Sequence, residues 1–302
     1  MSFSLPRATL VLICLLVADA CENKAPSRKI WSEVSGEKAL AHVQKLVDLG
    51  PRPPGSDAIV RARAYIEEQL ESYGWQVAEQ SFTDQTPRGE TKFVNLIARY
   101  GKASSSRDLF LLCSHYDTKI FDSFPFVGAN DGGSSTGLLL EMARVLTLEP
   151  RLAEKIELVF FDGEEAVENF TQTDGIYGSR HFAQVLAQNR STKTFRGGVL
   201  FDMVGDRSLD ITLPPNSPAK ITADIFASAD ALNLRNYFTY FEQDITDDHT
   251  PLNAIGIPVV DLIDFHYPPW HTAEDTMDKL SAESLQIVGS VTAYYLANFA
   301  YK

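Results

Sequence analysis

Cysteine is scarce in this chain, which has three cysteines in 302 residues. Cys14 lies in an N-terminal apolar segment that we expect to be removed from the mature protein, which leaves Cys21 and Cys113. A small disulfide-held scaffold needs a dense set of cysteines, so no disulfide framework is expected here. Cys113 falls inside the apolar stretch 109–113 and is expected to be a small buried hydrophobic residue.

Positive charge is also in short supply. The chain has 27 Lys and Arg residues against 40 Asp and Glu residues, a formal net charge of −13. No basic stripe is present, which excludes nucleic acid as a partner and argues against docking on anionic lipid headgroups. Internal repeats, heptads and low-complexity tracts are absent as well. With 44% hydrophobic residues, a chain of this length can bury a large core as one domain.

The N-terminal apolar run is too short to span a bilayer permanently. It covers residues 8–17, follows Arg7 and ends at the Ala-x-Ala site formed by residues 18–20, which is the pattern of an export signal. We therefore expect residues 1–20 to be a signal peptide. The mature protein is expected to be exported, that is, periplasmic, secreted or anchored to a membrane by a lipid.

Cys21 follows this cleavage site directly, at the position of the acylated cysteine in a bacterial lipoprotein. Ala18 and Asp19 fit the usual lipobox poorly, so plain cleavage before Cys21 is an open alternative. Residues 21–36 are polar and are predicted to form a flexible tether. Residues 37–302 contain no dividing linker and are predicted to be a single catalytic domain.

Strand-like and helix-like segments alternate along this domain. Strands are expected at 75–82, 94–100, 108–114, 156–161, 198–204 and 257–263, and helices at 37–49, 58–73, 134–148, 178–189, 218–232 and 282–299. Strands that alternate with long helices predict an α/β three-layer sandwich, with a mixed, mostly parallel, twisted sheet and helices on both faces. The closely spaced early strands are expected to add an antiparallel edge.

One strand ends in a group of carboxylates. The apolar run 156–161 is followed at once by Asp162, Gly163, Glu164 and Glu165. Open α/β sheets place their active sites at the carboxyl ends of their strands. Adjacent residues on extended backbone point to opposite sides, so one glutamate can bind a metal while the other moves protons.

Four other predicted strand ends carry residues of similar type. His115 and Asp117 share one strand face, a spacing that suits a histidine held by a carboxylate behind it. Asp131 lies in a glycine-flanked loop just before a helix, Asp202 lies in an apolar strand, and His271 follows the last strand. Each alone is more simply a cap or a hydrogen-bonding residue.

Together, these histidines and acids form a nitrogen and oxygen ligand set that suits zinc. Asp131, Glu165 and His271 would make a three-ligand catalytic site with an open fourth position. Glu164 would remain beside the metal as a general acid and base.

From residue 49 to the last helix, the chain resembles the zinc exopeptidase superfamily that contains secreted aminopeptidases and glutaminyl-peptide cyclotransferases. The sequence His-Tyr-Asp-Thr-Lys at 115–119 is close to the cyclotransferase motif His-Tyr-Asp-Ser-Lys. The segments 177–181 and 247–251 (Asp-Asp-His-Thr-Pro) also match that branch, and Trp270 directly precedes the expected zinc histidine. The resemblance implies a zinc exopeptidase-like fold.

The resemblance also implies roles for individual residues. In the cyclotransferase branch, Asp131, Glu165 and His271 hold one zinc ion, Asp202 and Asp247 are catalytic, and Trp270 forms part of the substrate pocket. In the aminopeptidase branch, His115 and Asp202 complete a second zinc site that shares Asp131, so a second ion is a possibility. Phe170 stands where the animal cyclotransferases have a pocket tryptophan, which keeps an aromatic wall but removes an N–H donor.

The activity implied is zinc-dependent conversion of the N-terminal glutamine of peptides or proteins to pyroglutamate, with release of ammonia. An exported zinc aminopeptidase that hydrolyses N-terminal residues is the alternative. Peptide or protein N-termini are the expected substrates, and a monomer without a transmembrane domain is the expected form.

Overall fold

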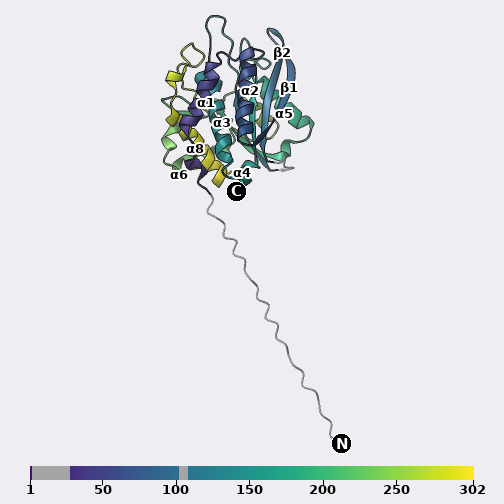
Figure 1. Ribbon diagram of the computed structural model, residues 1–302, viewed down its shortest axis with the longest axis vertical. Coiled ribbons are helices and arrows are strands. Elements are labelled where there is room, and N and C mark those ends of the chain that lie inside the picture. Colours follow the sequence, from purple (N-terminus) through teal and green to yellow (C-terminus); the bar gives the residue numbers. More distant parts are fainter. Residues whose placement is uncertain (2–27, 102–107) are drawn as a thin grey trace.

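The computed structural model describes residues 28–101 and 108–302, together with Met1. Cys21 and nearly all of the predicted signal peptide lie outside the described residues. The described chain forms one eight-stranded sheet with helices packed against it (Figure 1). The predicted α/β three-layer architecture is therefore confirmed.

The strand order in the sheet is β1-β2-β4-β3-β5-β8-β6-β7. The strands are β1 (Trp75–Thr86), β2 (Gly89–Tyr100), β3 (Leu109–His115), β4 (Ile156–Phe161), β5 (Phe195–Asp202), β6 (Ile211–Leu213), β7 (Phe238–Tyr240) and β8 (Val259–Ile263). The four central strands β4, β3, β5 and β8 run parallel. β1 and β2 form the expected antiparallel edge, and β6 pairs antiparallel with β8.

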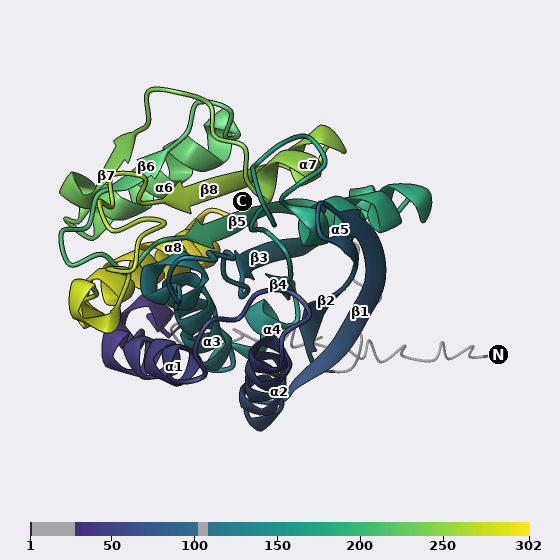
Figure 2. The same ribbon diagram turned by 90° about the horizontal axis from the view of Figure 1, so that it is seen from above.

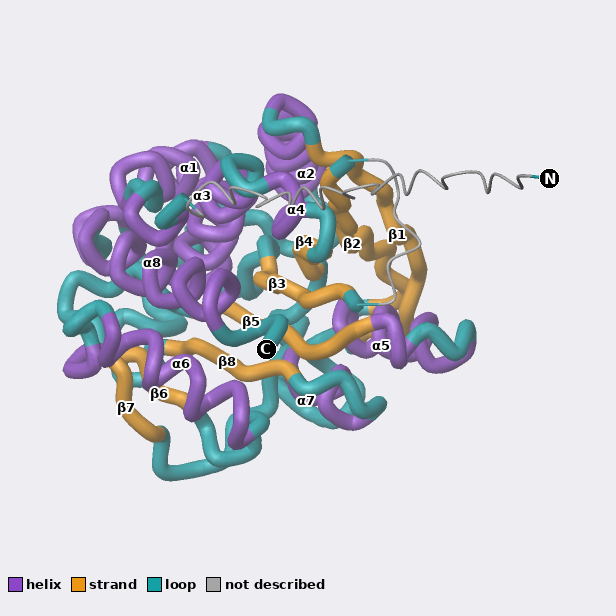
Figure 3. The backbone as a smooth tube through the Cα atoms, turned by 90° about the horizontal axis from the view of Figure 1, so that it is seen from below, coloured by secondary structure: helices purple, strands orange, loops and turns teal. Residues whose placement is uncertain are grey.

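Helices cover both faces of the sheet. They are α1 (Gly36–Asp48), α2 (Asp57–Ser72), α3 (Ser135–Leu146), α4 (Pro150–Ala153), α5 (Tyr177–Gln188), α6 (Ala219–Ala231), α7 (His249–Ala254) and α8 (Ala282–Asn298). Figure 2 shows α1, α2, α3 and α8 on one side of the sheet and α5 and α7 on the other. Figure 3, seen from below, shows the strands running between these two helical layers.

The central strands are buried because both faces are covered. Every residue of β3, β4 and β8 is buried, which explains why their sequences are continuous apolar runs and not alternating ones. Three helices begin at a serine whose hydroxyl accepts a backbone N–H three residues later: Ser35 for α1, Ser56 for α2 and Ser281 for α8.

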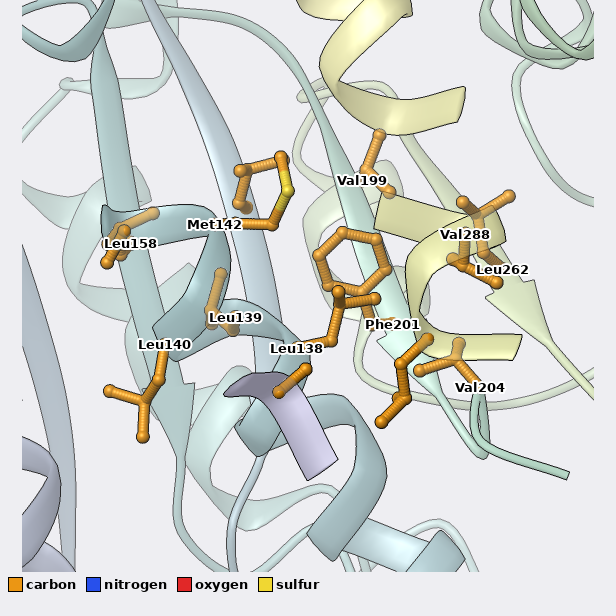
Figure 4. Close-up of a cluster of buried hydrophobic side chains, with 14 of the residues drawn as sticks. Leu138, Leu139, Leu140, Met142, Leu158, Val199, Phe201, Val204, Leu262 and Val288 are labelled. Carbon is orange, nitrogen blue, oxygen red and sulfur yellow. The ribbon is translucent and has the colours of Figure 1, made fainter. Parts of the chain in front are cut away.

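The main hydrophobic core lies between the sheet and the layer formed by α1, α3 and α8. Figure 4 shows Leu138 and Met142 of α3 beside Phe201 of β5 and Val288 of α8, and all four are fully buried. Burial of each such side chain contributes roughly 1.5–3 kcal/mol. This packing holds β5 in place up to Phe201, the residue directly before Asp202.

The prediction that a tether extends to residue 36 is wrong. Residues Ile30–Ser32 form a short helical turn, and Ile30 and Val34 are buried. The ring of Trp31 packs edge-on against Tyr294 of α8, with 4.9 Å between ring centroids. Three apolar residues in a polar segment are enough to dock it, so the domain includes residues 28–36.

The short elements β6, β7 and α7 have no counterpart among the predicted segments. Strands of three residues carry too few side chains for a periodic pattern to be recognised. Within residues 28–101 and 108–302, no helix combines the length and the apolar character needed to cross a membrane.

Candidate metal site and active site

The predicted ligands gather at the carboxyl ends of the parallel strands. His115 and Asp202 are the last residues of β3 and β5. Asp131 lies in the turn Ala129–Ser134 between β3 and α3, Glu165 follows β4, and His271 follows β8. The order of the sheet makes neighbours of these strand ends, so Asp131 and His271, 140 positions apart in the chain, reach one point.

Asp131, Glu165 and His271 form a compact group. The Nε2 atom of His271 lies 3.3 Å from Oδ2 of Asp131 and 3.3 Å from Oε2 of Glu165. The Oδ2 atom of Asp131 is buried and has no hydrogen-bond partner among the described residues. Both carboxylates are buried, whereas His271 is partly exposed toward solvent.

This spacing fits a tetrahedral zinc ion. Two ligand atoms at about 2.0–2.1 Å from such an ion lie about 3.3–3.4 Å apart. Both histidine–carboxylate separations in the group have that length, and one histidine with two carboxylates is a donor set that zinc accepts. Asp131, Glu165 and His271 therefore fit the predicted metal.

A second group shares Asp131. The Nε2 atom of His115 lies 3.3 Å from Oδ1 of Asp131 and 3.3 Å from Oδ1 of Asp202. Asp131 thus presents one oxygen to each histidine. The predicted first and second ligand sets are both assembled, so the positions of the side chains do not by themselves fix the number of ions.

Charge interactions in these groups are strong. Burial alone would raise the pKa of Asp131, but the nearby rings of His115 and His271 lower it below its usual value. Burial and the Asp131 charge raise the pKa of Glu165 to about 7. The carboxylates outweigh burial at His271 and raise its pKa to about 10. A divalent cation would compete with these protons for the same lone pairs.

Asp117 supports three parts of the site. Its Oδ1 lies 3.4 Å from Nδ1 of His115, the arrangement predicted from their spacing in the sequence. Its two oxygens also accept the backbone N–H groups of Glu164 and Glu165, at 3.1 and 3.2 Å. One buried carboxylate therefore orients a candidate ligand and the segment that carries both glutamates.

The backbone is strained at two of the site residues. His271 has φ 56° and Met203, directly after Asp202, has φ 47°. Positive φ is uncommon for residues other than glycine and gathers where function constrains the backbone. At Trp270 and His271 the turn brings the two rings together in a stack, with 4.3 Å between centroids.

Glu164 stands apart from the candidate ligands. It is half-buried and lines the cavity, whereas its neighbour Glu165 is buried. Burial, together with the charges of Asp247 and Glu165, raises the pKa of Glu164 well above its usual value. A carboxyl group of this kind can hold a proton near neutral pH and exchange it with a bound molecule.

The candidate ligands and Glu164 open into a cavity of about 470 Å³. Its aromatic wall includes Trp270 and Phe170, which are exposed at its mouth. Asp202 and Asp247 also line it, and burial followed by the charges of Asp261 and Asp202 raises the pKa of Asp247 well above its usual value. The structure therefore brings together all the residues predicted for the site.

Sequence reasoning missed several residues of this region. Asp261 lies with Asp247 and His249, which the sequence already placed behind Asp247, in a further buried group. Phe121 and Phe126 both pack edge-on against His271. Asp275 accepts the backbone N–H groups of Asn130 and Asp131. Asp261 lies in the middle of an apolar strand, and a buried acid there is the one signal that could have marked it.

The fold and the site together define an α/β enzyme with a candidate metal centre at the carboxyl edge of its sheet. Residues 95–296 match Peptidase family M28, and the chain belongs to that family. It is 32% identical over 280 residues to the bovine glutaminyl-peptide cyclotransferase-like protein, covering 82% of this chain and 72% of that one. The resemblance predicted from the motifs is confirmed.

Solved structures show the same relationship. The chain superposes on the glutaminyl cyclase of an Acidobacteriales bacterium with a TM-score of 0.79 and 33% identity, over 91% of this chain and 96% of that one. A Zn-dependent exopeptidase from Parabacteroides distasonis gives a TM-score of 0.80 with 26% identity, over 88% and 98%. The fold is thus common to both predicted activities, while the higher sequence identities are to cyclotransferases.

Proposed function

We propose that this protein is a zinc-dependent glutaminyl-peptide cyclotransferase, which converts the N-terminal glutamine of peptides or proteins to pyroglutamate and releases ammonia. The observation that carries the proposal is the position of Glu164 in the cavity beside the candidate ligands and opposite a second acid, Asp247. The sequence identity to glutaminyl-peptide cyclotransferases over most of both chains supports it.

In this reaction the α-amine of the substrate attacks its own γ-carboxamide carbon. A C–N bond forms, the bond to the amide nitrogen breaks, and that nitrogen leaves as ammonia. A zinc ion held by Asp131, Glu165 and His271 would act as a Lewis acid toward the amide oxygen. Glu164 accepts the proton from the attacking amine and delivers it to the leaving nitrogen, which requires the raised pKa of its carboxyl group.

Asp202 and Asp247 assist this proton transfer. Two buried acids that face one cavity resist joint ionisation, so the pair holds a shared proton. Its remaining charge raises the proton affinity of Glu164, which keeps the proton taken from the amine until it is passed to the leaving nitrogen. Trp270 and Phe170 enclose the glutamine side chain and keep water away from the reacting carbon. Phenylalanine at position 170 offers the substrate an apolar surface without a donor.

Aminopeptidase activity is the second candidate function. The specific observation in its favour is the pair of ligand groups that share Asp131, because two adjacent metal ions can activate a water molecule. One assay separates the two. Purified protein is incubated with Gln-initiated and Leu-initiated peptides, and ammonia release is measured beside cleavage of the first peptide bond.

The expected result is ammonia and pyroglutamyl product from the Gln-initiated peptide, with no cleavage of either peptide. Release of free leucine without cyclisation would overturn the proposal in favour of the aminopeptidase. The same proposal includes export through a signal peptide at residues 1–20, with Cys21 as a candidate lipid anchor, and function as a monomer. Mass spectrometry of the mature N-terminus tests the processing.

A further inference from the structure

Arg52 is a fully buried cation that the proposed reaction does not use. Its side chain has no exposed surface, and the described residues place no carboxylate oxygen within 4.0 Å of its guanidinium. A buried charge is costly unless hydrogen bonds compensate it. Burial lowers the pKa of Arg52 only to about 10, so the side chain remains a cation at neutral pH.

Backbone carbonyl groups take the place of a carboxylate partner. The Nη1 atom of Arg52 donates to the carbonyl of Val127 at 2.8 Å, and its Nη2 atom donates to the carbonyl of Gly128 at 3.1 Å. Its Nε atom donates to the carbonyl of Tyr116 at 3.2 Å, and Nη1 also reaches Leu46 at the end of α1. One side chain therefore links α1, the end of β3 and the segment 127–128.

The main chain of Arg52 is held as firmly as its side chain. Its N–H donates to Oγ1 of Thr118 at 2.8 Å, and its carbonyl accepts the N–H of Thr118 at 3.2 Å. Pro51 and Pro53 flank it, and a residue before proline is confined to extended backbone. The proline-rich turn recognised in the sequence thus presents one arginine in one orientation.

The segment that Arg52 contacts leads directly to Asp131. Gly128 has φ 51°, and a Cβ atom there would lie 2.4 Å from the carbonyl oxygen of Asp131, so the turn is very tight. At the other end of this turn, the carboxylate of Asp275 accepts the backbone N–H groups of Asn130 and Asp131 at 2.8 and 3.1 Å. A cation thus binds the carbonyls of this turn and an anion binds its N–H groups.

We propose that Arg52 and Asp275 form a clamp on residues 127–131, which positions the carboxylate of Asp131 and thereby sets the affinity of the site for zinc. They are positioning residues, because neither lines the cavity. The charge of Arg52 also offsets part of the negative charge of Asp117, Asp131 and Asp275. The inference rests on the proposed zinc site, and its test is measured on metal affinity.

The test uses metal-free protein and titrates zinc in competition with a chromogenic chelator. The variants are Arg52→Met, Arg52→Lys and Asp275→Asn. Arg144→Met is the control, because Arg144 is mostly buried and, like Arg52, donates to a backbone carbonyl, that of Glu33, but lies on α3 away from the turn. Thermal unfolding of each metal-free variant is recorded in parallel.

We expect Arg52→Met and Asp275→Asn to weaken zinc binding about 10–100-fold, the usual effect of removing a partner that orients a metal ligand. Arg52→Lys keeps the charge but loses the planar fork of donors, so its affinity should be intermediate. Arg144→Met should lower the unfolding temperature and leave zinc affinity unchanged. The double variant that combines Arg52→Met with Asp275→Asn should lose little more zinc affinity than either single variant, because the two residues act on one turn.

Zinc affinity of Arg52→Met within threefold of the parent would overturn the clamp, as would an equal loss of affinity in Arg144→Met. If Arg52→Met does not fold, Asp275→Asn and Arg52→Lys provide the test. Zinc affinity equal to that of the parent in both variants would overturn the inference. A parent protein that binds zinc but releases no ammonia from Gln-initiated peptides would instead refute the proposed function, and the affinities would still test the clamp.

Discussion

Two groups of acids and histidines in this protein use similar residue types but differ in size and geometry. The ligand cluster consists of His115, Asp131, Glu165, Asp202 and His271, and its nitrogen–oxygen separations are all 3.3 Å. The Asp261 cluster consists of Asp247, His249 and Asp261, and its shortest nitrogen–oxygen separation is 3.5 Å, from Nδ1 of His249 to Oδ2 of Asp261. Both are buried.

The surroundings of the two clusters differ as well. The ligand cluster is supported by Asp117 and Asp275, which hold the backbone and one of its histidines. Among buried atoms of the described residues, neither ring nitrogen of His249 and neither oxygen of Asp261 has a hydrogen bond. In the ligand cluster the same is true only of Nδ1 of His115 and Oδ2 of Asp131. Suitable residue types are therefore not enough for a metal site, because spacing and backbone support decide whether the atoms can share one ion.

The largest expected effect tests which cluster holds zinc. His271→Ala removes one of three ligands and should abolish both zinc retention and cyclisation, whereas His249→Asn should retain zinc. Zinc content after dialysis, measured by atomic spectroscopy, checks this. Loss of zinc from the His249 variant alone would reverse the assignment of the clusters.

His115→Ala refines the same comparison within the ligand cluster. It leaves Asp131, Glu165 and His271 intact, so one zinc ion should remain. Equal loss of metal from the His115 and His271 variants would indicate a two-ion centre and favour the aminopeptidase reading.

The next effect separates proton transfer from metal binding. Glu164→Gln keeps the size of the side chain and removes its titratable group, and Glu164 serves both amine deprotonation and ammonia departure. We expect kcat to fall by the upper part of roughly 10²–10⁴-fold, with zinc content and unfolding temperature nearly unchanged. If most of the cyclase activity survives, or if zinc is lost together with activity, the roles of Glu164 and Glu165 must be the reverse of those proposed.

The smallest effect concerns the stability cost of the Asp261 cluster. Burial, with the charges of Asp202 and Asp248, raises the pKa of Asp261 well above its usual value. The folded protein therefore binds the proton of the Asp261 carboxyl group more tightly than the unfolded chain does. The stability that this protonated group contributes is lost progressively as pH rises above about 4, the usual aspartate pKa.

Asp261→Asn removes this loss. The variant should match the parent near pH 4 and have the higher unfolding temperature at pH 8, because it has no proton to lose there. Thermal unfolding at both pH values measures it, with zinc content as the control. A variant that is less stable at pH 8 and has lost zinc would show that the Asp261 cluster binds metal.

The sequence by itself determined the fold class and marked the candidate site residues that the structure brings together. Apolar runs such as 156–161 mark buried parallel strands, and acids or histidines directly after such runs fall at the edge where α/β sheets bind ligands. Those are local patterns, readable within about ten residues. Asp131, Glu165 and His271 as a group, and Asp117 behind His115, follow from them.

Only the tertiary structure decided which of these atoms meet and what holds them. Arg52 reaches Gly128 across 76 positions, and Asp275 reaches Asn130 across 145, with no local pattern that links either pair. The docking of Ile30 against the domain and the burial of Asp261 are likewise decided by packing. The reason is physical: hydrogen bonds and burial depend on distance in space, and residues far apart in sequence come within that distance only after the sheet order is set.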